Sequence, residues 1–236
     1  MQKINYGKIL EAKLNELTEK GERPRLLLHA CCAPCSSYVL EYLCKYFEIT
    51  LLYYNPNISP ESEYNARAEE LIRLAGAIKG DFEGAGDVKV IVAPYEPAPY
   101  DAIANGREDL PEGGARCMDC YRLRLEYTAR LAAEKGYDYF CTTLSISPHK
   151  NATALNTIGG SLAETYGVPY LLSDFKKNGG YLRSCELSKK YSLYRQNYCG
   201  CAASGGNGHT EMAAPRKNFS TIDLPLDGEG GPPCGG

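Results

Sequence analysis

The sequence alternates between short apolar runs and longer segments with helical spacing, and this alternation is the feature that most constrains the fold. The apolar runs have the length and composition of buried strands, and turn residues such as Gly, Pro and Asn lie near their ends. Strands are predicted over residues 26–30, 48–58, 88–95, 137–144 and 167–175. Helices are predicted over residues 36–47, 61–78, 115–136 and 148–167, in addition to a long N-terminal helix. Such an order predicts an α/β domain with a mostly parallel sheet flanked by helices.

Polar side chains follow the predicted strands at the points where the strands end. In α/β sheets the carboxyl ends of parallel strands meet at one edge, and ligands bind there. We therefore expect a functional site at this edge, formed by Cys31 and Cys32, Asn55 and Asn57, Tyr95, and Thr142 and Thr143.

Length and composition predict one folded domain and a tail. With 236 residues, of which 44% are hydrophobic, the chain can bury a single core, which we assign to residues 1–204. Residues 205–236 are rich in Gly and Pro and predict a flexible C-terminal tail. The sequence contains neither a run of about 18 apolar residues nor a signal-peptide core, so we expect a soluble, cytoplasmic protein with no membrane association.

The chain has 11 cysteines, which in a reducing compartment are more typical of metal or redox sites than of disulfides. Cys117 and Cys120 form a C-x-x-C at the start of a predicted helix, and with Cys31 and Cys32 they would supply four thiolates. Four thiolates suit a [4Fe–4S] cluster or a structural zinc ion. The adjacent pair favours the cluster, whose iron corners are spread apart, while zinc and unliganded buried thiols remain alternatives. Cys35 is either a ligand of an accessory metal or a small residue in the first turn of the helix.

Cys199 and Cys201 flank a glycine in the sequence CGC. Gly200 permits the unusual backbone angles that a disulfide between these two cysteines would need. A strained, exposed bridge is easily reduced, so the pair is a candidate for a reversible dithiol that stores two electrons and two protons. A zinc knuckle is the alternative.

Residues 174–198 combine cations with aromatic rings. This segment contains six Lys or Arg residues and two acidic residues, although the whole chain has a net charge of −3. Cations that neutralise phosphates, interleaved with rings that stack on unpaired bases, favour an RNA surface; a solvated charged face is the alternative. The segment SPHKN predicts a helix N-terminus capped by Ser147, which would bind anions.

Taken together, six motifs resemble the QueH-type epoxyqueuosine reductases, a cobalamin-independent family that completes queuosine in tRNA. The motifs run in order from residue 26 to about residue 204 and read HACCAPCSSYVLEYL, YYNPNI, RCMDCYRLRL, FCTTLSISPHKN, DFKKNGGYLRS and YRQNYCGC. The predicted sheet is also similar to Rossmann-like layouts. Because the chain lacks a Walker loop and a G-x-G-x-x-G motif, we predict neither ATP nor NAD binding.

The resemblance implies an oxidoreductase that performs a reductive deoxygenation. The epoxide of epoxyqueuosine, at the wobble position of tRNAs for Tyr, His, Asp and Asn, would become the alkene of queuosine with electrons from an unidentified donor. The resemblance also implies a redox-active disulfide pair, formed by Cys199 and Cys201. It further implies a [4Fe–4S] cluster whose ligands are Cys31, Cys32, Cys117 and Cys120. Cys35 is the candidate ligand of an additional mononuclear iron.

Nine residues are candidates for substrate contacts, as proton donors or as partners of the base and phosphates. They are Asn55, Asn57, Thr143, His149, Lys150, Tyr181, Arg183, Arg195 and Tyr198.

Two other function classes compete with a reductase. A cluster-dependent tRNA sulfur transferase would carry an SGGxDS-type loop after the first strand, where this chain has ACCAPCSS. A zinc-stabilised RNA-binding module would also use cysteines and a basic aromatic surface.

Overall fold

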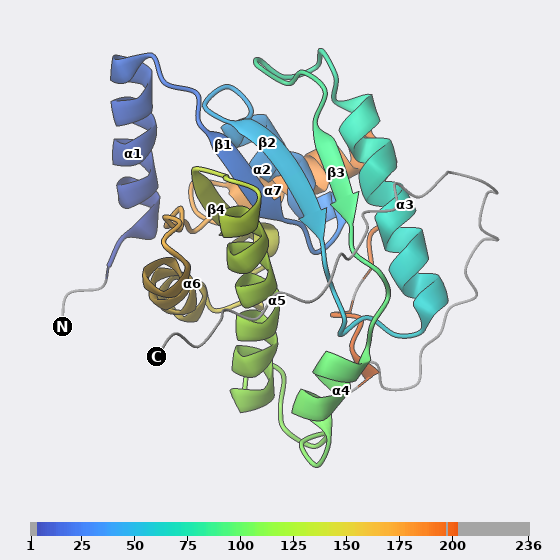
Figure 1. The fold of residues 1–236 in the computed structure, drawn as a ribbon. Coiled ribbons are helices and arrows are strands. Elements are labelled where there is room, and N and C mark those ends of the chain that lie inside the picture. Colours follow the sequence, from blue (N-terminus) through green and yellow to red (C-terminus); the bar gives the residue numbers. More distant parts are fainter. Residues whose placement is uncertain (1–3, 197, 203–236) are drawn as a thin grey trace, which may run out of the picture.

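The computed structural model describes residues 4–196 and 198–202. At its centre is a sheet of four parallel strands in the order β3-β2-β1-β4 (Figure 1). The strands are β1 (Arg25–His29), β2 (Glu48–Tyr53), β3 (Lys89–Val92) and β4 (Tyr139–Thr142). The strand order reverses beside β1, which is the place where α/β sheets bind ligands. The predicted α/β class with a parallel sheet is confirmed.

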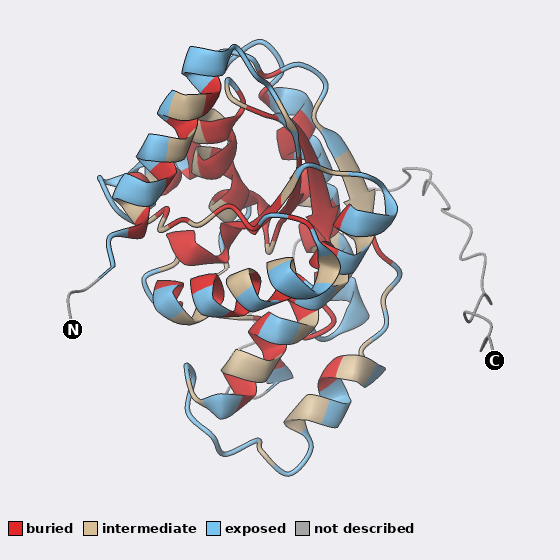
Figure 2. Ribbon diagram, turned by 60° about the vertical axis from the view of Figure 1, so that its left-hand side comes forward, coloured by how far each residue is buried: buried red, intermediate tan, exposed pale blue. Residues whose placement is uncertain are grey.

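Helices cover both faces of the sheet (Figure 1). Successive side chains of a strand point to opposite faces, so Leu26 and Leu28 of β1 pack in one apolar core and Leu27 packs in the other. The strands β1, β2 and β4 are mostly buried and the edge strand β3 is half-buried, whereas the outer faces of the helices are exposed (Figure 2). The first core contains side chains of α1 (Tyr6–Lys20), α2 (Ala33–Leu43), α3 (Glu61–Ala77) and α7 (Gly180–Lys190), and the second contains those of α5 (Ala115–Glu134) and α6 (Ala152–Tyr166).

The segment 167–175, predicted to be a strand, makes only a single bridge to the sheet, between Tyr170 and Phe140. The side chain of Asn156 in α6 explains why the pairing stops. Its Nδ2 donates to the Ser173 carbonyl at 2.8 Å and its Oδ1 accepts from the Ser173 N–H at 2.9 Å. An asparagine therefore takes the backbone groups that a neighbouring strand would use.

Two helices were not predicted from the sequence, the short α4 (Ala98–Ala104) and α7. Cys185 lies within α7. A 3-10 helix, η1 (Thr143–Ile146), follows β4 directly. Within the described residues no helix is both long and apolar enough to cross a lipid bilayer. The predicted tail at 205–236 lies outside the described residues, so the domain boundary stays a prediction.

Gly159 allows α6 to approach Tyr170 closely. A Cβ at position 159 would lie 2.5 Å from atoms of the Tyr170 ring. For Gly159→Ala we expect a net loss of about 1–2 kcal/mol in the free energy of unfolding, because overpacking outweighs the gain in helix propensity. Urea denaturation measures this difference.

The adjacent Gly160 is a matched control, because a Cβ there would meet nothing within 4 Å. Gly160→Ala should leave stability unchanged or raise it by up to about 1 kcal/mol. Equal unfolding free energies for the two variants would contradict the packing argument.

Candidate active site

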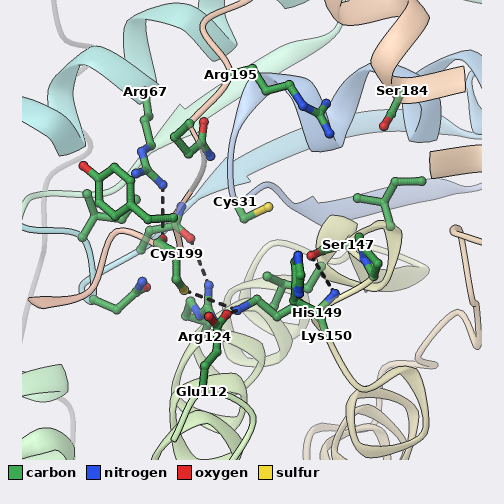
Figure 3. Close-up of a pocket in the computed structure, with 18 of the residues that line it drawn as sticks. Cys31, Arg67, Glu112, Arg124, Ser147, His149, Lys150, Ser184, Arg195 and Cys199 are labelled. Atoms are coloured by element: carbon green, nitrogen blue, oxygen red, sulfur yellow. Dashed lines mark hydrogen bonds and ion pairs between the residues drawn. The ribbon is translucent and has the colours of Figure 1, made fainter. Parts of the chain in front are cut away.

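A cavity of about 520 Å³ opens at the carboxyl edge of the sheet (Figure 3). Cys31 lines it from the segment after β1, Asn55 and Asn57 from the segment after β2, and Leu144 and Ile146 from η1, which follows β4. The rest of the wall comes from α3, α5 and α7, from Glu112 and residues 147–150, and from Arg195, Gln196, Tyr198 and Cys199. The parallel sheet thus brings segments that are far apart in the sequence to one cavity.

Three cysteines form a compact sulfur group beside this cavity. The Sγ atoms of Cys31, Cys32 and Cys35 all lie within 4.8 Å of one another. Cys32 has extended backbone at the N-cap of α2, and Cys35 lies in the first helical turn. The vicinal pair therefore occupies the turn between strand and helix, where its two thiols need not point to opposite faces of a strand.

Hydrogen bonds within the sulfur group give its thiols different pKa values. Contacts from the Cys32 and Cys35 thiols, together with the Thr143 hydroxyl, lower the pKa of Cys31 well below its usual range, although burial opposes this shift. The hydrogen bond to Cys31 raises the pKa of Cys32 to about 12. Cys31 is thus the first thiol of the group to become a thiolate, which is the form that binds metals.

Cys117 and Cys120 lie in the first two turns of α5, as the sequence predicted, and both are buried. The Cys117 Sγ accepts a hydrogen bond from the Gly113 N–H at 3.3 Å. Cys117 belongs to the apolar cluster against which Cys31 packs. Within residues 4–196 and 198–202, however, the sulfur group defined by the 4.8 Å separation contains neither Cys117 nor Cys120.

Arg124 carries a buried positive charge among these sulfurs. Its Nε donates to the Cys120 carbonyl at 3.2 Å, and its Nη1 donates to the Asn55 Oδ1 at 3.4 Å. Burial opposes the charge, but the sulfurs of Cys120, Cys199 and Cys31 raise the pKa of the guanidinium. One cation therefore interacts with sulfurs from three separate segments of the chain.

His29, at the end of β1, is fully buried and neutral. Its Nε2–H donates to the Tyr54 carbonyl at 3.1 Å, so Nδ1 is the acceptor in its 2.8 Å contact with the Thr142 hydroxyl. Burial and the charge of Arg124 lower its pKa to about 4. The imidazole thus ties together the ends of β1, β2 and β4 without adding charge.

The segment from Cys199 to Cys201 is fastened to α3. Arg67 Nη1 donates to the Cys199 carbonyl at 3.2 Å, and the Ser59 N–H donates to the Gly200 carbonyl at 3.0 Å. Gly200 has φ +99°, and a Cβ there would lie 3.0 Å from the Arg67 guanidinium. Both the backbone angle and the space therefore require glycine at this position.

The two thiols of this segment face different surroundings. Cys199 lines the cavity, whereas Cys201 is buried beside Tyr100 and Cys120. A hydrogen bond with Cys201, and then burial, raise the pKa of Cys199 well above its usual range, while Lys150 and Arg124 oppose that shift. Cys199 therefore holds its proton more strongly than a free cysteine does.

A buried ion pair on α3 contacts the segment that contains Cys199. Arg67 Nε lies 2.7 Å from Glu63 Oε1, and the side chains are only 2% and 1% exposed. Glu63 also accepts hydrogen bonds from the Tyr194 hydroxyl at 3.2 and 3.3 Å. The guanidinium lies 5.2 Å from the centre of the Tyr198 ring. Two charges on one face of α3 thus hold Tyr194, Tyr198 and Cys199 beside the cavity.

Most of the predicted substrate contacts line the cavity. They are Asn55, Asn57, His149, Lys150, Tyr181, Arg195 and Tyr198. Thr143 lies beside the sulfur group instead, where its hydroxyl accepts from the Cys31 N–H at 3.3 Å. Arg183 is not part of the lining and makes ion pairs with Glu41 at 2.7 Å and Glu186 at 2.8 Å. Tyr95 also lies outside the lining and packs on the Tyr64 ring at 5.2 Å.

The prediction that Ser147 caps a helix is wrong. The N-cap of α6 is Asn151, whose side chain accepts from the Ala154 N–H at 3.1 Å. Ser147 Oγ instead accepts from the His149 N–H at 3.3 Å, within the loop between η1 and α6. Asn satisfies the same N-cap requirement as Ser, and the helix begins four residues later than Ser147 would place it.

Sequence reasoning missed three charged residues of the lining, Arg67, Glu112 and Arg124. Arg124 stands four residues after Cys120, so helical spacing alone places it one turn from that cysteine. Arg67 has Glu63 at the same spacing. Glu112 has no comparable signal, because its ion-pair partner Lys150 is 38 residues away.

The buried pair predicts a large effect of mutating Glu63. In Glu63→Ala the Arg67 charge stays buried without its carboxylate, so we expect a loss of about 3–5 kcal/mol in the free energy of unfolding. The control is Glu134→Ala, which removes a half-exposed partner of Arg130 and should cost about 0.5 kcal/mol or less. Urea denaturation compares the two, and similar losses would contradict a role for the buried pair.

Comparison with known proteins identifies the family. Residues 26–206 match the model of the family described as epoxyqueuosine reductase QueH. The chain is 46% identical over 204 residues to the epoxyqueuosine reductase QueH of Staphylococcus epidermidis, covering 85% of this chain and 84% of that protein. It is 43% identical to the protein of the same name from Streptococcus pyogenes serotype M1, covering 97% and 89%, and 36% identical to that of Thermotoga maritima, covering 76% and 89%. The resemblance found in the motifs is confirmed, and this chain, an oxidoreductase, belongs to the epoxyqueuosine reductase QueH family.

Proposed function

We propose that this protein reduces the epoxide of epoxyqueuosine to the alkene of queuosine at the wobble position of tRNAs for Tyr, His, Asp and Asn. The family name supports the reaction. The conversion consumes two electrons and two protons and releases the oxygen as water. A tRNA substrate also supports a cytoplasmic location.

The observation that carries this proposal is the position of Cys199. The Cys199 thiol lines the same cavity as Cys31, and it makes a hydrogen bond with the thiol of Cys201. A pair of thiols that closes to a disulfide releases two electrons and two protons, which is the quantity that the epoxide requires.

The chemistry of the buried sulfur ligands fits a [4Fe–4S] cluster held by Cys31, Cys32, Cys117 and Cys120. The first two belong to the compact sulfur group, and the others are buried in the first turns of α5. The positive charge of Arg124 favours a negatively charged centre nearby. When bound, such a cluster would supply electrons one at a time. Cys35, the third member of the sulfur group, is the candidate ligand for an additional mononuclear iron.

Aromatic and basic side chains at the cavity support recognition of an RNA nucleotide. Tyr181 lines the cavity with a side chain that is 40% exposed, and the Arg195 guanidinium lies 5.4 Å from its ring centre. An exposed ring beside a cation suits stacking on an unpaired base. His149 also lines the cavity and is exposed, so it is a candidate for a phosphate contact.

Serine variants separate the two proposed cysteine roles. Cys199→Ser and Cys201→Ser should each abolish turnover of epoxyqueuosine tRNA. Both variants should keep a normal iron content, because neither Cys199 nor Cys201 is a proposed ligand of the cluster. Cys117→Ser should lose iron. The assay uses protein purified without oxygen, and iron, zinc and sulfide are measured on the same samples.

Cys185→Ser is the control, since this half-buried cysteine lies in α7 outside the lining of the cavity. It should keep both its iron content and its turnover. A colourless wild-type protein that contains zinc and does not turn over the tRNA would refute the reductase and favour a zinc-stabilised RNA-binding module.

A further inference from the structure

The proposed reaction needs a group that delivers a proton to the oxygen as it leaves the substrate. Cys201 is buried with Tyr100 and Cys120 and does not line the cavity, so it cannot deliver its proton to the substrate directly. Several lining residues carry exchangeable protons, and their surroundings differ. The inference that follows rests on the proposed function and concerns which of these residues is the acid.

Lys150 differs from the other candidates because it is buried and touches the redox pair. Its side chain is 8% exposed, and its Nζ lies 3.4 Å from Cys199 Sγ and 2.8 Å from Glu112 Oε1 (Figure 3). His149 also lines the cavity, but it is exposed, and no contact with either sulfur of the pair is found for it among the described residues. The phenol of Tyr198 interacts with Glu63 and Arg67 instead of a sulfur.

The loop that carries Lys150 is fixed on both sides. The Lys150 N–H donates to the Ser147 carbonyl at 3.2 Å, and the Lys150 carbonyl accepts from the Lys176 ammonium at 3.3 Å. Asn151, the next residue, is the N-cap of α6. The direction of the ammonium into the cavity is therefore set by the backbone as well as by its two partners.

The charges around Lys150 determine what its proton can do. Burial lowers its pKa, but the Cys199 sulfur and the Glu112 carboxylate raise it to a net value above that of a free lysine. Such an ammonium does not lose its proton to water at neutral pH, yet it protonates a stronger base such as an alkoxide. The Cys199 thiol, whose Sγ lies 3.4 Å from the Lys150 Nζ, is the nearest source of a replacement proton.

We propose that Lys150 is the catalytic acid, that it protonates the epoxide oxygen as the C–O bonds break, and that its amine then takes the proton of the Cys199 thiol. Glu112 is a positioning residue that holds the ammonium against Cys199. The electrons balance because two C–O bonds and two S–H bonds break while the C=C bond of the product, the S–S bond between Cys199 and Cys201 and the two O–H bonds of water form. The two thiol protons leave with the oxygen as water, and the electron donor that the reductase already requires reopens the disulfide.

The test is a single turnover of epoxyqueuosine tRNA by anaerobically purified protein with and without added small alkylamines. Lys150→Ala should slow queuosine formation by about a hundredfold. Ethylammonium should restore part of that rate, because a free amine can occupy the space of the lost side chain and carry the proton. Glu112→Gln, which keeps Lys150, should be slowed by a smaller factor, and iron content should be normal in both.

Lys150→Arg distinguishes proton transfer from charge alone. A guanidinium keeps the positive charge but is a much poorer proton donor, so this variant should stay slow. The inference is overturned if Lys150→Ala reacts at the wild-type rate, if Lys150→Arg does, or if no alkylamine restores the rate of Lys150→Ala. Absence of turnover by the wild-type protein refutes the proposed function itself, and this outcome is distinct from the others.

Discussion

The parallel arrangement of the four strands is the constraint on which the rest of the structure depends. Parallel strands end at one edge of a sheet, and each connection must cross back through a helix. For this reason Cys31 after β1, Asn55 after β2 and Thr143 after β4 meet although long stretches of chain separate them. The buried imidazole of His29 links the same three strand ends.

The second feature that defines the site is a set of buried positive charges. Arg67, Arg124 and Lys150 all line the cavity and are nearly inaccessible to solvent, which is costly for a cation unless it has partners. Arg67 has Glu63, Lys150 has Glu112 and Cys199, and Arg124 has the sulfurs. The cations Arg124 and Lys150 oppose the rise that burial causes in the pKa values of Cys120 and Cys199, and they would favour a negatively charged centre held nearby.

The sequence predicted the order of helices and strands more accurately than it predicted the contacts between side chains. Helical and strand periodicity are local, so the alternating elements and the position of the cysteines at their ends could be inferred. The strand at 167–175 was wrong because a distant side chain, Asn156, takes its backbone hydrogen bonds. Ser147 was a plausible cap, but Asn151 performs that role. Glu112 could not have been found, since only the folded chain brings it to Lys150.

The central claim is that the electrons reaching the substrate come from Cys199 and Cys201. The most direct measurement mixes the reduced, oxygen-free protein with an equal amount of epoxyqueuosine tRNA, without an electron donor, and stops the reaction with acid. Mass spectrometry then counts disulfides between the two cysteines against queuosine formed. The account predicts one disulfide for each queuosine, and queuosine formed while both thiols remain reduced would contradict it.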